Sequence, residues 1–115
     1  MKGKLDYNRE MKSISIDSTK IDELSVQIQN EEKIIKKVQK AKNIRGSQVI
    51  LLTIDRLLKE AKISLEDIER MYIHMGTGSY TGLRVGAAIA NTIAFCLEIP
   101  VNDKKSGEFV YPSYQ

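Results

Sequence analysis

The sequence contains few of the residues from which catalytic and metal sites are built. It has a single cysteine, Cys96, and a single histidine, His74, and no aspartate or glutamate lies between Glu69 and Glu98. One cysteine cannot form an internal disulfide, which favours a reducing, cytoplasmic setting. One histidine and one cysteine do not make a metal site. We expect no metal site, and the chain is poorly equipped as a hydrolase, because no serine–histidine–acid set and no paired carboxylates stand within one motif.

Long apolar segments are missing as well. The charge-poor run after Arg84 is shorter than the roughly 20 residues of a membrane-spanning helix, and it contains Asn91. The first residues, MKGKLDYNRE, lack the apolar stretch of a signal peptide. We therefore expect no membrane association. Residues 1–11 are polar and show no periodic pattern, and we interpret them as a disordered leader.

The charge of the chain is modest in total but concentrated in one part. The 115 residues are enough for one domain and carry a net charge of +3. A basic run between positions 33 and 45 fits either contact with RNA phosphates or the solvated edge of a sheet. The sheet edge is favoured, because no aromatic residue for base stacking stands within the run. The run consists of Lys33, Lys36, Lys37, Lys40, Lys42 and Arg45.

Apolar and polar residues alternate in the first part of the chain. Ile14 and Ile16 alternate with serines, and residues 24–28 repeat the pattern. This period of two predicts two half-buried strands. Residues 33–41 fit a helix as well as a strand, but two strands alone make an unstable sheet, so we predict a third, edge strand there. A fourth strand is predicted at 71–75.

Residues 46–61 have the period of an amphipathic helix. Val49 and Leu52 fall outside its apolar stripe, among charged residues, and are candidates for a second contact surface. The sequence SLED at 64–67 predicts a short capped turn. The predicted core stripe is Ile50, Leu51, Ile54, Leu57, Leu58 and Ala61.

A glycine-rich turn, GTGSYTG at 76–82, leads into the next helix. Its spacing matches neither the dinucleotide-binding nor the phosphate-loop pattern. Ser79 or Thr81 would cap the helix, whose first turn, with Arg84, then offers N–H groups and positive charge to an anion. Asp17, at the end of the first strand, is a candidate for a metal held by a nucleotide. The alternatives are that the glycines only allow a tight turn and that Asp17 is a turn or cap residue.

The helix at 82–97 is apolar on almost all sides, which is typical of a helix buried on two faces. Small residues on one side would permit close approach of a partner, and Phe95 would anchor it. The predicted sheet-facing side is Val85, Gly86, Ile89, Ala90, Ile93, Cys96 and Leu97. The predicted partner interface is Val49, Leu52, Arg84, Ala87, Ala88, Asn91, Ala94 and Phe95.

The predicted elements follow the order strand, strand, strand, helix, strand, helix, strand, and Val101 begins the last strand. This order is typical of a mixed α/β layer in which the two helices are crossovers between parallel strands. Residues 103–115 end in an aromatic tail to which we assign no structure.

Three segments carry a family resemblance: IDST at 16–19, LLTIDRLLKEAKISLEDIE at 51–69 and GTGSYTGLRVGAAIANTIAFCLEIPV at 76–101. They resemble the N-terminal lobe of the TsaB (YeaZ) family, and the resemblance covers residues 12–102. It implies a single actin-like ATPase lobe of ribonuclease H-like topology, with a mixed five-stranded sheet of order 3-2-1-4-5 and two main helices. Members of this family take part in the threonylcarbamoyladenosine modification of tRNA as non-catalytic partners.

The resemblance also implies the partners. The N-terminal helices of family members pack against the related catalytic subunit TsaD or against another copy of themselves. We therefore expect a TsaD-like partner or a homodimer, and indirect contact with tRNA. The histidines that hold the metal in the catalytic relative have no counterpart in the helix at 46–61.

The sequence departs from the family pattern at three points. Thr77 stands where the family usually has Pro, His74 where it usually has Gly, and the chain holds one lobe where the family normally has two. Because the nucleotide cleft of this superfamily lies between lobes, we expect no tightly bound cofactor, and ATP with magnesium only together with a second lobe or a partner. The first hypothesis is a non-catalytic scaffold. The alternatives are a nucleotide-binding lobe completed by another chain and a basic RNA-binding module.

Overall fold

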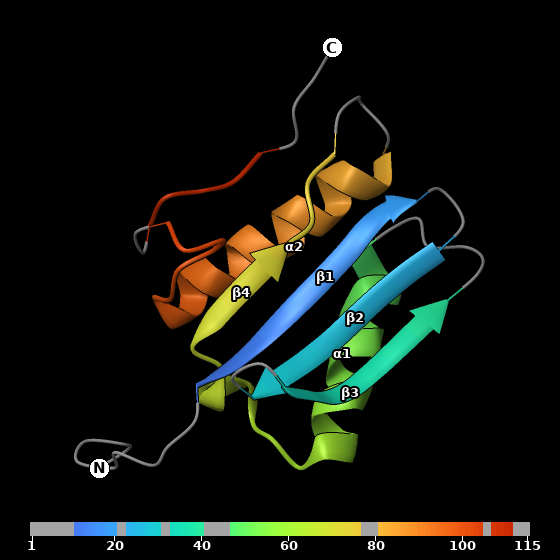
Figure 1. Cartoon of the computed structure of the whole chain (residues 1–115). Coiled ribbons are helices and arrows are strands. Elements are labelled where there is room, and N and C mark those ends of the chain that lie inside the picture. Colours follow the sequence, from blue (N-terminus) through green and yellow to red (C-terminus); the bar gives the residue numbers. More distant parts are fainter. Residues whose placement is uncertain are drawn as a thin grey trace.

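The computed structural model describes residues 11–20, 23–30, 33–40, 47–76, 81–104 and 107–111. The four strands that it describes form one sheet in the order β3-β2-β1-β4 (Figure 1). The two alternating segments thus form strands as predicted, and the ambiguous residues 33–40 form the predicted edge strand. The elements are β1 (Lys12–Lys20), β2 (Glu23–Asn30), β3 (Lys33–Lys40), α1 (Ser47–Ala61), the 3₁₀ helix η1 (Leu65–Asp67), β4 (Arg70–Ile73) and α2 (Thr81–Leu97).

The register of β1 places the core on one face of the sheet. β1 runs antiparallel to β2 and parallel to β4, and Ile14 stands opposite both Ile28 and Met71. Because side chains alternate along a strand, this register brings the apolar residues of three strands to the same side. α1 lies against β2 and β3, and α2 lies against β1 and β4. Both helices share one buried apolar cluster with these strands.

The fifth strand of the predicted sheet is not confirmed. Val101 pairs with Met71 in a single parallel bridge, and the chain then turns away. The turn uses left-handed backbone at Asn102 and Asp103, with φ of 50° and 64°. The side chain of Asn102 takes over where the strand stops: its Oδ1 accepts from Ile73 N at 2.8 Å, and its Nδ2 donates to Ile73 O at 3.0 Å. The outer edge of β4 is therefore paired, first by backbone and then by a side chain.

The helix wheel places Leu51 and Cys96 wrongly. Leu51, predicted in the core stripe of α1, is 46% exposed, whereas its neighbour Ile50 is fully buried. Leu51 lines a surface groove together with Val85 and Ile93 of α2, so part of its side chain stays in water. Thr53 is buried instead, and its hydroxyl donates to the carbonyl of Val49 at 2.7 Å. On α2, Cys96, predicted on the sheet-facing side, is exposed.

Gly86 is the position at which α2 comes closest to the sheet. A Cβ atom at this position would overlap Ser18 Oγ and would lie 3.1 Å from Ile73 Cδ1. Both approaches are closer than ordinary van der Waals contact, so the packing of α2 on β1 and β4 requires glycine here.

The C-terminal part of the chain, to which the sequence assigned no structure, returns along α2 (Figure 1). Residues 107–111 lie beside the helix, and Val110 belongs to the buried cluster. Its backbone is held by Asn91 of α2. The predicted leader at 1–11 lies outside the described residues except for Met11. Among the described helices, none has the length and apolar character required to cross a membrane.

Candidate functional site

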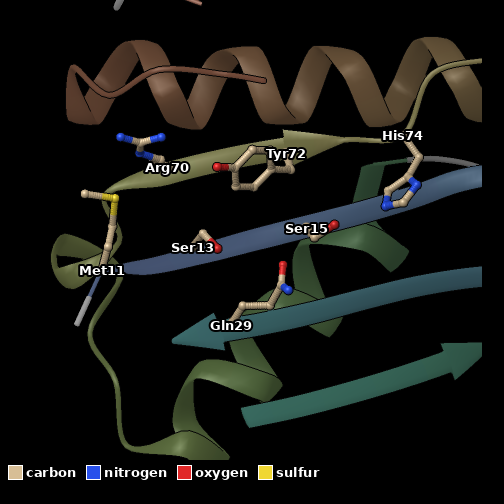
Figure 2. Close-up of a pocket in the computed structure, with 7 residues that line it drawn as sticks. All are labelled: Met11, Ser13, Ser15, Gln29, Arg70, Tyr72 and His74. Carbon is tan, nitrogen blue, oxygen red and sulfur yellow. The ribbon is translucent and has the colours of Figure 1, made fainter. Parts of the chain in front are cut away.

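The face of the sheet opposite the helices, here called the open face, is polar. Figure 2 shows side chains from β1, β2 and β4 on this face, where Ser13 and Ser15 of the central strand lie between Gln29 and Tyr72. No described helix packs on it. The residues that line its hollow, about 620 Å³ in volume, are Met11, Ser13, Ser15, Gln29, Arg70, Tyr72 and His74.

A smaller hollow of about 160 Å³ continues the open face to the carboxyl ends of β1 and β4. Asp17 of β1 and His74, which follows β4, both line it. Their closest atoms, His74 Nδ1 and Asp17 Oδ2, are 3.8 Å apart. Parallel neighbouring strands bring their carboxyl ends to one edge of a sheet, which explains the meeting of residues 57 positions apart in the chain.

The Asp17 carboxylate is held in its ionised form by Thr19, two residues further along β1. Burial alone raises its pKa, but hydrogen bonds from Thr19 outweigh this effect, and so the pKa is lowered from 3.8. Thr19 donates twice to Asp17 Oδ1, from its hydroxyl at 2.6 Å and its backbone N–H at 3.0 Å. His74 and Lys20 lower the pKa further by charge. Asp17 and Thr19 both lie within β1, so the prediction that Asp17 is a turn or cap residue is not confirmed, and its metal-binding role stays a prediction.

Of the other anion-binding candidates, Arg84 lies near the same end of the sheet. A Cβ on Gly76 would lie 3.6 Å from Leu83 and 3.8 Å from Thr19, so the start of α2 stands close to the end of β1. Arg84 is exposed on the first turn of α2, which has no acidic residue. Thr81 is the first residue of α2, and its side chain lies outside what is described; Ser79 lies outside the described residues altogether.

No metal site is present in the described part of the chain, where no three His, Cys, Asp or Glu side chains come together. At the far end of the open face, the Arg70 guanidinium instead pairs with Asp103 at 2.7 Å. The Tyr72 hydroxyl donates to the same carboxylate oxygen at 3.2 Å. Tyr72 and Asp103 raise the pKa of Arg70, so its guanidinium stays charged and forms an ion pair with Asp103 at this corner.

The second candidate surface lies on the outer side of the two helices. A groove of about 390 Å³, here called the helix groove, runs between α1 and α2 and is mostly apolar. A neighbouring hollow shares Leu51 and Ile93 with it and extends to Ile63 and Leu65. The helix groove is lined by Leu51, Val85, Ala88, Ile89, Thr92 and Ile93.

The structure divides the predicted partner interface into two groups. Leu52, Arg84, Ala88 and Phe95 are exposed, with Leu52 at 68% and Phe95 at 64%. Val49 is half-buried and packs against the core.

The predicted exposure of Ala87, Asn91 and Ala94 is wrong, because all three are buried. The C-terminal segment lies beside this side of α2 and binds Asn91. The physical reason is that a residue 19 positions further along the chain contacts this side of the helix and covers it. A helical wheel includes only the residues of the helix and cannot show such a contact.

Of the six residues that line the helix groove, sequence reasoning places only Ala88 in the partner interface. It places Leu51 in the core of α1, Thr92 on no surface, and Val85, Ile89 and Ile93 on the sheet-facing side of α2. A signal for Thr92 existed, because its hydroxyl is able to donate to the carbonyl four residues earlier and leave its methyl group on an apolar surface. The structure shows this bond to Ala88 O at 2.7 Å.

Comparisons with known proteins identify the family. The family model described as "TsaD: tRNA N6-adenosine threonylcarbamoyltransferase" matches residues 19–105. The match spans more than half of the chain, so the chain belongs to this family. Within it the chain is a TsaB/YeaZ-like protein, as the three segments quoted above predict.

Three curated relatives share the name "tRNA threonylcarbamoyladenosine biosynthesis protein TsaB". The protein of Bacillus subtilis is 34% identical over 55 residues, which are 48% of this chain and 24% of the relative. That of Haemophilus influenzae is 40% identical over 52 residues, 45% of this chain and 22% of the relative. That of Buchnera aphidicola is 30% identical over 83 residues, 72% of this chain and 39% of the relative.

Solved structures support the fold. YeaZ from Pseudomonas aeruginosa superposes with a TM-score of 0.72 at 22% identity, over 83% of this chain and 44% of that protein. A second structure, an uncharacterized protein with similarity to peptidase YEAZ from Pseudomonas aeruginosa, gives 0.71 at 23% identity, over 79% of this chain and 41% of that protein. The matched region spans less than half of the length of each of these relatives.

Proposed function

We propose that the protein is a non-catalytic cytoplasmic subunit of the machinery that makes threonylcarbamoyladenosine on tRNA, and that it acts by docking a helical partner on the helix groove. The names of the curated relatives support the pathway. The observation that carries the docking role is an apolar groove between the two helices, lined by the partly exposed side chain of Leu51.

The physical argument rests on unburied apolar area. Leu51, Leu52 and Phe95 expose about half or more of their surface on the two helices. Burying such side chains fully is worth roughly 1.5–3 kcal/mol each. Ala88 and Thr92 are small, so a helix of a partner is able to approach the floor of the groove closely.

The partner is a second helix pair, from a TsaD-like catalytic subunit or from a second copy of this chain. A self-complementary groove favours a two-fold dimer, in which the same residues meet on both subunits. Contact with tRNA would then pass through the partner subunit.

The association is tested by light scattering with Ala88→Glu and Gln27→Glu. Ala88 lies in the helix groove and Gln27 on the open face, so both variants add one negative charge on opposite sides of the sheet. We expect the unmutated chain to be a dimer at tens of micromolar, Ala88→Glu to be a monomer and Gln27→Glu to remain a dimer. A monomeric unmutated chain would contradict self-association.

The hetero-complex is tested separately by co-purification with the TsaD-like subunit of the same cell. We expect capture by the unmutated chain and by Gln27→Glu, and loss of capture with Ala88→Glu. Equal capture by all three chains would place the partner elsewhere on the molecule.

A second candidate function is nucleotide binding by a lobe that another chain completes. The observation in its favour is that Asp17 is held ionised by Thr19, which lies near the start of α2. A helix N-terminus offers N–H groups to phosphate, and a carboxylate offers oxygen to magnesium. Calorimetric titration with ATP and magnesium distinguishes this candidate from the scaffold.

A further inference from the structure

The side of α2 next to the C-terminal segment carries one polar side chain, Asn91, which is only 7% exposed. A buried amide is unfavourable unless its donor and acceptor are both satisfied. Neighbouring positions one turn away, Ala87 and Ala94, are buried and small. Asn91 is therefore a polar side chain between small apolar ones. A segment that packs against it must satisfy its hydrogen-bond donor and acceptor.

Both hydrogen bonds of Asn91 go to the backbone of one residue. Its Nδ2 donates to Val110 O at 2.7 Å, and its Oδ1 accepts from Val110 N at 2.9 Å. Paired residues of antiparallel strands exchange the same two bonds. The amide of Asn91 thus contacts Val110 as a neighbouring strand would, and this contact is independent of the side chain at that position.

The residues around Val110 have the alternation of an extended segment. Val110 is 6% exposed and shares the buried cluster with Ala90 and Ala94, whereas Phe109 and Tyr111 on either side are exposed. The Phe109 ring meets Phe95 of α2 edge to face, with centroids 6.2 Å apart, and meets Tyr111 at 6.5 Å. The segment is held by the two hydrogen bonds between Asn91 and the Val110 backbone, by the buried side chain of Val110 and by the contact between the Phe109 and Phe95 rings.

We propose that this side of α2 is a binding site for an extended peptide segment, and that residues 107–111 of the chain itself occupy it. The site selects an apolar residue with a free backbone N–H at the position of Val110, and an aromatic residue before it. A proline at that position is excluded, because proline has no N–H to donate to Asn91 Oδ1.

The first test measures, by amide hydrogen exchange in the intact chain, how strongly the bond to Asn91 protects the Val110 N–H. The Val110 N–H is expected to exchange slowly in the unmutated protein and at least about tenfold faster in Asn91→Ala, which lacks the acceptor. The amide of Ile16 in the central strand serves as the control and should keep its protection. An unprotected Val110 amide in the unmutated protein, or unchanged exchange in Asn91→Ala, would overturn the proposal.

The second test asks whether the site takes the segment from outside. A fluorescently labelled peptide of residues 107–111, GEFVY, is titrated into the Val110→Pro chain, whose own segment lacks the N–H. We expect saturable binding, at least about tenfold tighter than to the unmutated chain, and none by the peptide GEFPY. Equal binding of the two peptides, or no saturation by GEFVY up to millimolar concentration, would show that the site does not bind a peptide through its backbone N–H.

Discussion

At the scale of single residues, Gly86 sets the distance between α2 and the sheet. Ser18 Oγ stands so close to Gly86 that there is no room for even a methyl group, and Ser18 is fully buried and unable to move into solvent. Gly86 thus fixes the position of the helix that carries the groove residues Val85, Ala88 and Thr92, although Gly86 itself does not line the groove.

Gly86→Ala should destabilise the protein by up to about 2 kcal/mol. The overpacking cost of roughly 1–3 kcal/mol exceeds the gain of about 1 kcal/mol in helix propensity. Urea unfolding measures the change. Gly76→Ala is the matched control, because the added Cβ there meets only ordinary contacts at 3.6–3.8 Å. The cost should shrink in a Ser18→Ala background; a Gly86→Ala protein as stable as the unmutated chain would contradict the close approach.

Thr19→Val should raise the pKa of the Asp17 carboxyl toward its ordinary value. The substitution removes the 2.6 Å hydroxyl bond and keeps the backbone N–H bond. Because the folded pKa is lowered, the stabilisation is fully present above pH 3.8 and is lost as the pH falls through the folded pKa. The stability difference between the two proteins should therefore be constant near neutral pH and shrink in that acidic window.

The measurement is a titration of the Asp17 carboxyl carbon by NMR. Thr92→Val is the control, because the Thr92 hydroxyl bonds to Ala88 O on α2 and should leave Asp17 unaffected. An unchanged Asp17 titration in Thr19→Val would mean that the hydroxyl bond contributes nothing to the ionised form.

At the scale of the elements, β4 shows how a strand ends its pairing without a fifth strand. Pro100 O accepts from Met71 N at 3.0 Å, Asn102 N donates to Met71 O at 2.9 Å, and the Asn102 side chain then satisfies Ile73. Asparagine suits this position twice, because it tolerates the left-handed backbone and carries both a donor and an acceptor.

Substitution of Asn102 separates these two roles. Asn102→Gly keeps the permitted backbone and loses the two hydrogen bonds to Ile73, so we expect a loss of about 2 kcal/mol. Asn102→Ala loses the bonds and also places a Cβ at φ of 50°, which adds about 1 kcal/mol. Thermal or urea unfolding of the pair gives the difference. Equal stability of the two variants would contradict a backbone role for asparagine.

The elements were largely predictable, and their surroundings were not. Alternating apolar residues predicted β1 and β2, and the need for a third strand predicted β3. The helix wheel failed at Ala87, Asn91 and Ala94, because burial there depends on segments distant in the chain rather than on local period. For the same reason, no local pattern predicted that Asp17 and His74 meet at one end of the sheet.

At the scale of the whole molecule, the two faces differ in polarity. One side presents apolar helix residues, and the other presents the polar open face with its shallow hollow. The hollow is lined from the sheet side by side chains of β1, β2 and β4 and their ends, and no described element forms a second wall. A nucleotide on this face would therefore keep much of its surface in water.

We expect no saturable heat when ATP and magnesium are titrated into the chain alone. One wall of polar side chains offers few contacts to offset the entropy lost by the bound nucleotide. The same titration with Asp17→Ala is the control for specificity. Saturable binding by the unmutated chain that Asp17→Ala weakens would favour the nucleotide-binding lobe over the scaffold.

The closed edge of β4 has a consequence for how the protein behaves when concentrated or warmed. A sheet recruits further strands, and eventually fibrils, through edges with unpaired N–H and C=O groups. The side chain of Asn102 removes that opportunity at β4, and the sequence of β3 at the other edge carries Lys33, Lys36, Lys37 and Lys40, whose mutual repulsion opposes stacking. We therefore expect partially unfolded molecules to resist amyloid-type aggregation, and Asn102→Gly to bring its onset to lower temperature in a thioflavin assay.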